Sequence, residues 1–406
     1  MADIDTTDLE PMLETVWQLG GSDLLLTVGS APLCRVNGEL EPLDGWGVLD
    51  SSDTERLILG CLTAVDRQRL HDDRELDFSF SWRALARMRG NVFYQRQCVA
   101  LALRLIPSTI PTPLDLGIPE AVVSLTSLPQ GLLLVTGPTG SGKSTTQAAL
   151  IDHINRYRKC HVVTIEDPIE YVHTNKLSAV NQREVGDDTH SFERALRSAL
   201  REDPDVLLIG EMRDPDSIQT ALTIAETGHL VFATLHTNDT ATALDRIVDV
   251  FPTDRQAQIR VQLAASLVGV VAQRLVPALS GTMVAAYEVM IATSAVRNLI
   301  RDGKSAQIRN VLLTNQREGM QTLEMALNAL VADGTVTYDD AVSRSLHPKE
   351  IKIRLAPLLA PPSSGGDGAN AAADGTLPRP APHAAVAADG GAGRFGRAVA
   401  GARGRR

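Results

Sequence analysis

The chain has 406 residues, of which 44% are hydrophobic and 22% charged, and its formal net charge is −10. This length predicts two or three domains with ample buried core. The acidic balance argues against a mainly electrostatic nucleic-acid binder, although it leaves room for local basic patches. The N-terminus lacks the pattern of a signal peptide, and no apolar stretch approaches the ~18–20 residues that span a bilayer. We therefore expect a cytoplasmic protein.

The four cysteines lie far apart in the sequence and form no C-x-x-C pair; they are Cys34, Cys61, Cys98 and Cys160. No zinc site can be recognised from this spacing. We therefore interpret the cysteines as buried free thiols.

Residues 1–105 have the pattern of a small α+β domain. Apolar residues at helical spacing predict helices over residues 8–19, 52–62 and 67–74. Alternating patterns predict strands over residues 23–28, 77–82, 86–97 and 101–105, and a hairpin over 34–40 around Asn37-Gly38.

The predicted strands carry a group of arginines: Arg83, Arg87, Arg89, Arg96 and Arg104. At alternating strand positions several of them would share one face of a sheet. A solvated face is the simplest interpretation for any one arginine. The alternative is that some of them contact phosphate at a domain or subunit interface.

Residues 106–119 contain four prolines, at positions 107, 111, 113 and 119. That density precludes a helix and predicts a semi-rigid linker. A hinge here would let the first domain move relative to the second.

From residue 120 to about 287 strands and helices alternate, as in a parallel α/β sheet. The clearest motif is GPTGSGKS at residues 137–144, which follows the apolar run Leu132–Val135 and precedes a predicted helix. This context is that of a phosphate-binding loop, whose backbone N–H groups and helix N-terminus attract phosphate. Lys143 would contact the β- and γ-phosphates and the Ser144 hydroxyl would hold Mg²⁺. The predicted nucleoside-triphosphate-binding residues are Gly137, Pro138, Thr139, Gly140, Ser141, Gly142, Lys143, Ser144 and Thr145.

Two further strands end in acidic residues. Strand 161–165 precedes Glu166, Asp167 and Glu170, which lie where open α/β sheets bind ligands; an acidic surface turn is the alternative. Strand 205–209 precedes Gly210-Glu211, the Walker B arrangement, in which an acid orients water or completes the Mg²⁺ shell. Because a glycine occupies the place of the usual preceding acid, we expect the 166–170 turn to share these roles. Arg213 follows, with either a structural role or a phosphate contact.

Another buried strand, 228–237, is flanked by His229 and His236. A lone histidine is usually a satisfied core residue. Beside a nucleotide site, however, a histidine after a strand could sense the γ-phosphate by hydrogen bonding. We favour this role for His236, and less so for His229.

The remaining pattern predicts a helical C-terminal region. Helices are expected over residues 192–201, 240–250 and 254–276, and a last strand over 287–291, followed by helices 294–302, 305–314, 323–333 and 339–345. From about residue 361 the chain is rich in Ala, Gly and Pro and is expected to be disordered. It ends in a small basic cluster, RFGRAVAGARGRR, interpreted as a solvated tail or a contact for acidic lipid or protein.

Four motifs occur in one order: GPTGSGKS, TIEDPIEYVH, DPDVLLIGEMRD and GHLVFATLHT. Together they resemble the Walker A, Asp box, Walker B and His box of the secretion-type traffic ATPases, over about residues 8–350. The segments SAVRNLIRDGK and GMQTLEMALNALV resemble the branch of type IV pilus retraction (twitching-motility) ATPases. The short N-terminus and the lack of a tetracysteine motif argue against the extension and type II secretion branches. The tail departs from the family pattern.

The resemblance implies an α/β fold with a PAS-like N-terminal domain (1–105), a linker (106–119), a RecA-like P-loop ATPase core (120–292), a helical C-terminal subdomain (293–355) and a disordered tail (356–406). It further implies a homo-hexameric ring with ATP between the two domains. Ser144, Glu170 and Glu211 would hold Mg²⁺. The implied catalytic residues are Glu211 as the Walker B acid, Glu170 as the Asp-box acid, the His-box residues His229 and His236, and Arg89 and Arg104 at the γ-phosphate, with Arg96 behind them.

The implied function is ATP hydrolysis that powers pilus retraction, at the inner face of the cell membrane. The implied partners are an inner-membrane pilus platform protein and a paralogous pilus ATPase, with no nucleic acid. The nearest alternative is a pilus extension or type II secretion ATPase. A nucleic-acid translocase would need a basic, aromatic-rich groove, and the 4% aromatic content argues against it. A non-hydrolysing regulatory subunit is disfavoured because all four motifs are intact.

Overall fold

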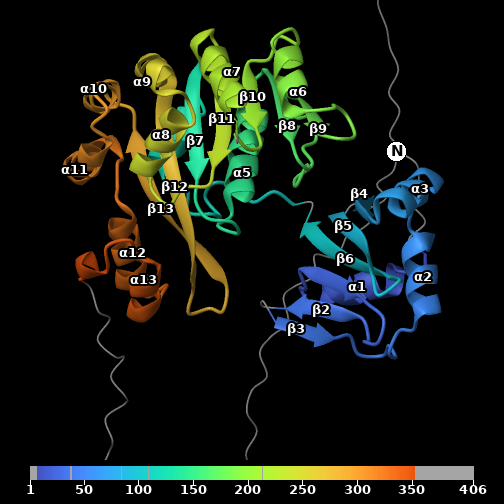
Figure 1. Cartoon of the computed structure of the whole chain (residues 1–406). Helices are drawn as coiled ribbons and strands as arrows, with labels where there is room; N and C mark the ends of the chain where they lie inside the picture. The colour runs from blue at the N-terminus through green and yellow to red at the C-terminus, as the bar shows by residue number, and fades with distance from the viewer. Residues whose placement is uncertain (1–6, 37–38, 84, 108, 213, 353–406) are drawn as a thin grey trace, which may run out of the picture. The chain divides into compact units, whose positions relative to one another are not determined.

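The computed structural model of the chain describes residues 7–352, except residues 37–38, 84, 108 and 213 (Figure 1). The predicted tail with its basic cluster, the Asn37-Gly38 turn and Arg213 therefore lie outside the described residues. Within those residues, no helix combines the length and apolar character needed to cross a bilayer.

The N-terminal part of the described chain forms a six-stranded antiparallel sheet in the order β3-β2-β1-β6-β5-β4. The strands are β1 (Asp23–Leu26), β2 (Leu33–Val36), β3 (Glu39–Pro42), β4 (Glu75–Trp82), β5 (Ala86–Gln95) and β6 (Cys98–Pro107). The helices are α1 (Glu10–Gln18), α2 (Ser51–Gly60) and α3 (Ala64–Asp73). Every helix and strand predicted in residues 1–105 is present, with ends shifted by a few residues.

Local chemistry explains these helices. In α1 a proline occupies the first turn, where its missing N–H costs nothing, and Met12, Leu13 and Val16 are buried at helical spacing. The Asp50 carboxylate caps α2, and the Thr63 hydroxyl caps α3. Cys34 and Cys61 are buried in this part of the chain, whereas Cys98 and Cys160 are partly exposed.

Residues 109–119 contain neither helix nor strand, as their prolines predict. Thr112 and Asp115 form a local turn, in which the Thr112 N–H and hydroxyl both donate to one Asp115 oxygen. The strand before this segment is longer than predicted, because β6 extends to Pro107.

The second sheet has seven strands in the order β13-β12-β7-β11-β10-β8-β9. Its strands are β7 (Gly131–Thr136), β8 (His161–Glu166), β9 (Ala179–Glu184), β10 (Val206–Ile209), β11 (Leu230–Leu235), β12 (Leu267–Pro277) and β13 (Met283–Ile291). Neighbours from β12 to β9 are parallel and β13 is antiparallel to β12. The predicted α/β architecture is therefore present, with β9 as a strand that the sequence pattern did not reveal.

Helices cover both faces of this sheet, as its continuous apolar strands require. Leu132 and Leu134 of β7 pack into one hydrophobic cluster, and Leu133 between them packs into another. The first cluster includes α6 (Phe192–Ala199), α7 (Pro215–Glu226), α8 (Thr240–Asp249) and α9 (Thr253–Ser266). The second includes α4 (Glu120–Leu125) and α5 (Lys143–Tyr157).

The prediction of one long helix over residues 254–276 is wrong. Helix α9 ends at Ser266, and Leu267 turns to extended backbone (ψ 132°) and begins β12. The run LVGVV is rich in β-branched residues and lies between β7 and β13, buried on both faces. Such a strand has no alternating pattern, so its periodicity cannot be told from that of a buried helix.

The C-terminal part of the described chain is helical, as predicted, with α10 (Ser294–Arg301), α11 (Ile308–Thr314), α12 (Leu323–Ala332) and α13 (Tyr338–Arg344). Short 3-10 turns η1 (Ser305–Gln307), η2 (Gln316–Glu318) and η3 (Pro348–Glu350) join or follow them. The core of α12 packs against Val276 and Ala286 of the β12–β13 pair, which attaches this region to the sheet.

Candidate active site

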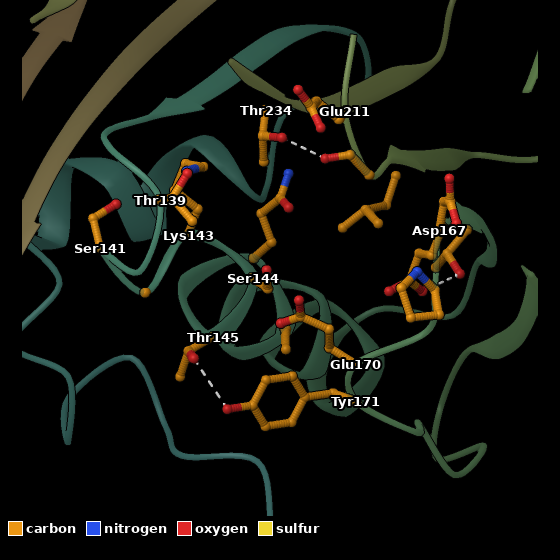
Figure 2. A pocket seen from close by; sticks show the side chains of 18 of the residues that line it. Thr139, Ser141, Lys143, Ser144, Thr145, Asp167, Glu170, Tyr171, Glu211 and Thr234 are labelled. Carbon is orange, nitrogen blue, oxygen red and sulfur yellow. Dashed lines mark hydrogen bonds between the residues drawn. The ribbon is translucent and has the colours of Figure 1, made fainter. Parts of the chain in front are cut away.

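A cavity of about 610 Å³ lies at the ends of β7, β8, β10 and β11, where these parallel strands deliver their connecting loops. Most of the residues predicted to act on a nucleotide line it: Arg89, Arg104, Thr139, Gly140, Ser141, Gly142, Lys143, Ser144, Thr145, Glu170, Glu211 and His236. Gly137, Pro138 and His229 are not among its lining residues. Figure 2 shows Lys143, Ser144, Glu170 and Glu211 around this cavity.

The loop between β7 and α5 depends on glycine at two positions. Gly142 is the N-cap of α5 at φ 84°, a left-handed conformation that suits glycine. Gly137 lies so close to the backbone of β12 that an added Cβ would overlap the Gln273 carbonyl oxygen and the Ser141 hydroxyl oxygen. The loop is therefore folded tightly ahead of the helix N-terminus, the geometry that binds phosphate.

Lys143 points back over this loop. Its Nζ donates to the carbonyl oxygens of Gly137 at 2.9 Å and Pro138 at 3.1 Å. Burial lowers the pKa of Lys143, while the Glu211 and Glu170 carboxylates act in the opposite direction. A buried cation next to the loop is suited to binding an anionic ligand, and the two acids are suited to binding a cation that accompanies it.

Gln273 of β12 holds the loop in place and was not recognised from the sequence. Its side chain is buried, accepts a hydrogen bond from the Thr146 hydroxyl at 2.7 Å and donates to the Ser141 carbonyl at 2.6 Å. It thus joins the loop to the first turn of α5. The mistaken helix over 254–276 concealed this residue, since only a strand beside β7 brings it to the loop.

The predicted acids come from two strand ends. Glu170 lies in the turn after β8, and Glu211 follows β10. The neighbouring Tyr171 hydroxyl is 3.0 Å from that of Thr145 in α5, which holds the turn against the helix (Figure 2). Glu166 is different, because its carboxylate accepts from Thr164 at 2.7 Å and Gln182 at 3.1 Å, and burial raises its pKa. The Glu166 carboxylate is therefore held by contacts within β8 and β9.

The structure separates the two predicted histidines. His236 lines the cavity, with its Nε2 at 3.2 Å from a Glu211 oxygen. His229 lies before the other end of β11, where its Nδ1 is 3.0 Å from the Ile224 carbonyl oxygen. The intervening strand spans roughly 20 Å at about 3.3 Å per residue. His229 therefore has a satisfied structural contact, and His236 alone of the pair is at the site.

The predicted arginines also divide. Arg89 and Arg104 are direct cross-strand partners on β5 and β6, and both line the cavity. The Arg104 Nε also contacts Asp23 at 2.8 Å. Arg83 pairs with Glu10 and Glu14, and Arg87 is buried against Glu184. Arg96 is exposed in the β5–β6 turn and is not among the cavity residues.

The donor set of this cavity fits a magnesium ion. Ser144, Glu170 and Glu211 offer hard oxygen ligands, which Mg²⁺ prefers. Within the described part of the chain no three His, Cys, Asp or Glu side chains are grouped closely enough to form a metal site by themselves. A magnesium ion shared with phosphate oxygens and water needs only one or two protein ligands.

The fold and the site together define a P-loop nucleotide-binding protein with a RecA-like core. The chain belongs to the type II/IV secretion system protein family, whose model matches residues 62–324. It is 45% identical over 342 residues to the "type IV pilus retractation ATPase PilT" of Pseudomonas aeruginosa, covering 84% of this chain and 99% of that protein. It is also 45% identical over 315 residues to the "twitching motility protein" of Neisseria gonorrhoeae, covering 77% and 84%.

Among solved structures, the chain matches a crystal structure of the "pilus retraction motor PilT and bound ADP". The identity is 48% and the TM-score 0.78, covering 84% of this chain and 98% of that one. The predicted family and fold class are therefore confirmed.

Proposed function

We propose that this chain is an ATP-hydrolysing motor that powers retraction of a type IV pilus. One observation carries the proposal. This chain is 45% identical, over 84% of its length, to a pilus retraction ATPase, and it gathers Lys143, Ser144, Glu170 and Glu211 around one cavity. Arg89 and Arg104, from the other sheet, line the same cavity.

The roles follow from position. The loop N–H groups and Lys143 would bind the phosphates of ATP, and Ser144, Glu170 and Glu211 would hold Mg²⁺, which stabilises charge on the transferred phosphoryl group. Glu211 would orient the attacking water, and His236, at 3.2 Å from it, would respond to the γ-phosphate. His229 has no proposed contact with nucleotide. Arg89 and Arg104 would bind the γ-phosphate, whereas Arg96 has no proposed role.

The proposed domain division is residues 1–105, 106–119, 120–292, 293–355 and 356–406. Two separate sheets, with a segment lacking helix and strand between them, support it. We further propose that the chain assembles as a homo-hexamer at the inner face of the cell membrane. There it would act on a membrane platform protein of the pilus, alone or with a paralogous ATPase.

The experiment replaces Glu211 by Gln, which keeps the shape of the side chain and removes its charge. Purified Glu211→Gln protein should bind ATP but lose turnover by at least about 10²-fold, as expected when a residue that orients water is disabled. Glu193→Gln, at an exposed ion pair with Arg197, is the control and should hydrolyse ATP like the parent. Undiminished turnover in Glu211→Gln would disprove the catalytic assignment.

Counting surface pili on cells that carry Glu211→Gln tests the direction of the motor. Excess pili with loss of surface motility are expected for a retraction motor. Cells without pili would instead support the extension alternative, and an unchanged count would remove the pilus from the proposal. Parent protein that binds ATP without turnover would support the regulatory-subunit alternative.

A further inference from the structure

Two buried charged side chains connect the arginine-bearing strand to the turn that carries Glu170. Arg87 on β5 and Glu184 at the end of β9 form an ion pair, with Nη2 and Oε2 separated by 2.8 Å. Both side chains are at least nine-tenths enclosed. Neither is among the residues that line the nucleotide cavity, so neither would touch the reacting atoms.

Glu184 uses the same oxygen to hold the acidic turn. Its Oε2 accepts a hydrogen bond from the backbone N–H of Ile169 at 3.1 Å, and Ile169 immediately precedes Glu170. Glu184 is itself well fixed, because its N–H donates to Asp188 and its carbonyl accepts from the N–H groups of Asp188 and Thr189. The carboxylate is therefore a firm anchor for the turn.

Arg87 also has a contact on its own sheet, although its buried Nε has no hydrogen-bond partner among the described residues. The nitrogen that contacts Glu184 also donates to the Ser79 hydroxyl of β4 at 2.7 Å. Two residues further along β5, and on the same face, is Arg89, which lines the cavity. Contacts thus run from Arg87 through Glu184 to the Ile169 N–H, next to Glu170. Arg89, two residues from Arg87 on the same strand, and Glu170 both line the cavity.

A buried ion pair is weak grounds for stability, because desolvation offsets most of the attraction. Its value lies in geometry, since an enclosed charge tolerates only the arrangement that pairs it. We propose that Arg87 and Glu184 are positioning residues that set the Glu170 turn relative to the arginines of β5. This inference rests on the proposed ATPase function and assigns to the pair a part in turnover rather than in nucleotide binding.

The test compares kcat for ATP with the affinity for ADP in three full-length variants. Glu184→Gln keeps an acceptor for Ile169 but removes the charge that Arg87 pairs with, and Arg87→Met keeps length without a donor. Each should lower kcat by roughly 10- to 100-fold, because misplacement of a catalytic group by about 1 Å can cost 10²-fold. ADP affinity should change by less than about threefold. The double variant should lose no more than the worse single variant, as expected for residues that act as one unit.

A matched control lies next to Glu184 on the same strand. Arg183 pairs with Glu202 at 2.8 Å, and both side chains are more exposed. Glu202→Gln makes the same chemical change and should leave kcat within about twofold, as expected for a more exposed pair. Arg87→Lys restores a positive charge and should recover part of the kcat lost in Arg87→Met. It also serves as the deciding variant if Arg87→Met does not fold.

Unchanged kcat in both single variants would overturn the inference, as would losses that multiply in the double variant. A loss of ADP affinity equal to the loss of kcat would overturn it too, because the pair would then act on binding. The proposed function fails separately, if the parent protein itself does not hydrolyse ATP.

Discussion

The variant Gln273→Leu tests whether the phosphate-binding loop depends on a residue outside its own motif. Leucine keeps the approximate volume and removes both polar atoms of the side chain. The Thr146 hydroxyl and the Ser141 carbonyl would then lose partners at 2.7 and 2.6 Å. Leaving a buried polar group without a partner costs about 1–3 kcal/mol, so two such groups predict a loss of roughly 3 kcal/mol or more.

That loss is measurable in two ways. At roughly 2–4 °C per kcal/mol, the thermal midpoint of the core should fall by about 6–12 °C. ADP binding must also restore the loop in the variant. If this takes about 1.4 kcal/mol of the binding free energy, the affinity for ADP should fall tenfold. Differential scanning calorimetry and titration with ADP measure the two quantities on the same protein.

A matched glutamine provides the control. Gln262 on α9 bonds to Gln219 and Glu226 at the surface, where water can replace the lost contacts. Gln262→Leu should therefore shift stability by less than about 1 kcal/mol and leave ADP binding unchanged. If Gln273→Leu behaves like Gln262→Leu, the assignment of Gln273 as the support of the loop is refuted.

Three further variants extend this test of the cavity. Gly137→Ala should weaken ADP binding by roughly 10- to 100-fold in titrations, since relieving the overlap with Gln273 and Ser141 costs about 1–3 kcal/mol; unaltered affinity would contradict the geometry. Gln147→Leu should leave the thermal midpoint unchanged or raise it while lowering kcat, because the buried Gln147 Nε2 has no protein partner among the described residues and lines the cavity; reduced stability with normal kcat would count against this. The parent protein should lose stability as the pH falls from 6.5 to about 4, and His173→Gln should abolish this loss. Burial lowers the pKa of His173 to about 4, so only the unfolded chain gains a proton in that window, at a cost of up to about 3 kcal/mol. Urea unfolding at pH 7 and pH 5 measures the free energy of unfolding of both proteins. Equal losses in parent and variant would contradict the role given to His173.

Much of the site could be predicted because its residues lie close together in the sequence. The segment from Leu132 to Ser144 contains a buried strand, a glycine turn and a helix start within one motif, and the structure has all three. The acids Glu170 and Glu211 were located by the strands before them, since the ends of parallel strands meet at one edge.

What sequence reasoning missed depends on contacts between distant segments. Gln273 bonds to Thr146 across 127 positions, and Arg87 meets Glu184 across 97. No periodicity within either segment specifies such a partner. Helix α7 was missed for another reason. Its start could have been predicted from nearby residues, since Asp214 is a usual N-cap residue and Pro215 is favoured in the first turn. His229 was placed near the site because both histidines flank one strand, yet a strand sends its two ends in opposite directions.

The pairing of Arg89 with Arg104 would let the cavity distinguish a triphosphate from a diphosphate. Two like charges placed directly opposite each other on neighbouring antiparallel strands repel. Asp23 offsets part of this through Arg104, but Arg104 remains largely exposed and Arg89 faces the same cavity. An additional phosphate group between the arginines would relieve the repulsion, and its loss on hydrolysis would restore it. A ligand can shift a conformational equilibrium only by its difference in affinity for the two states. The arginine pair would supply such a difference on the sheet that, in our proposal, Arg87 joins to the Glu170 turn.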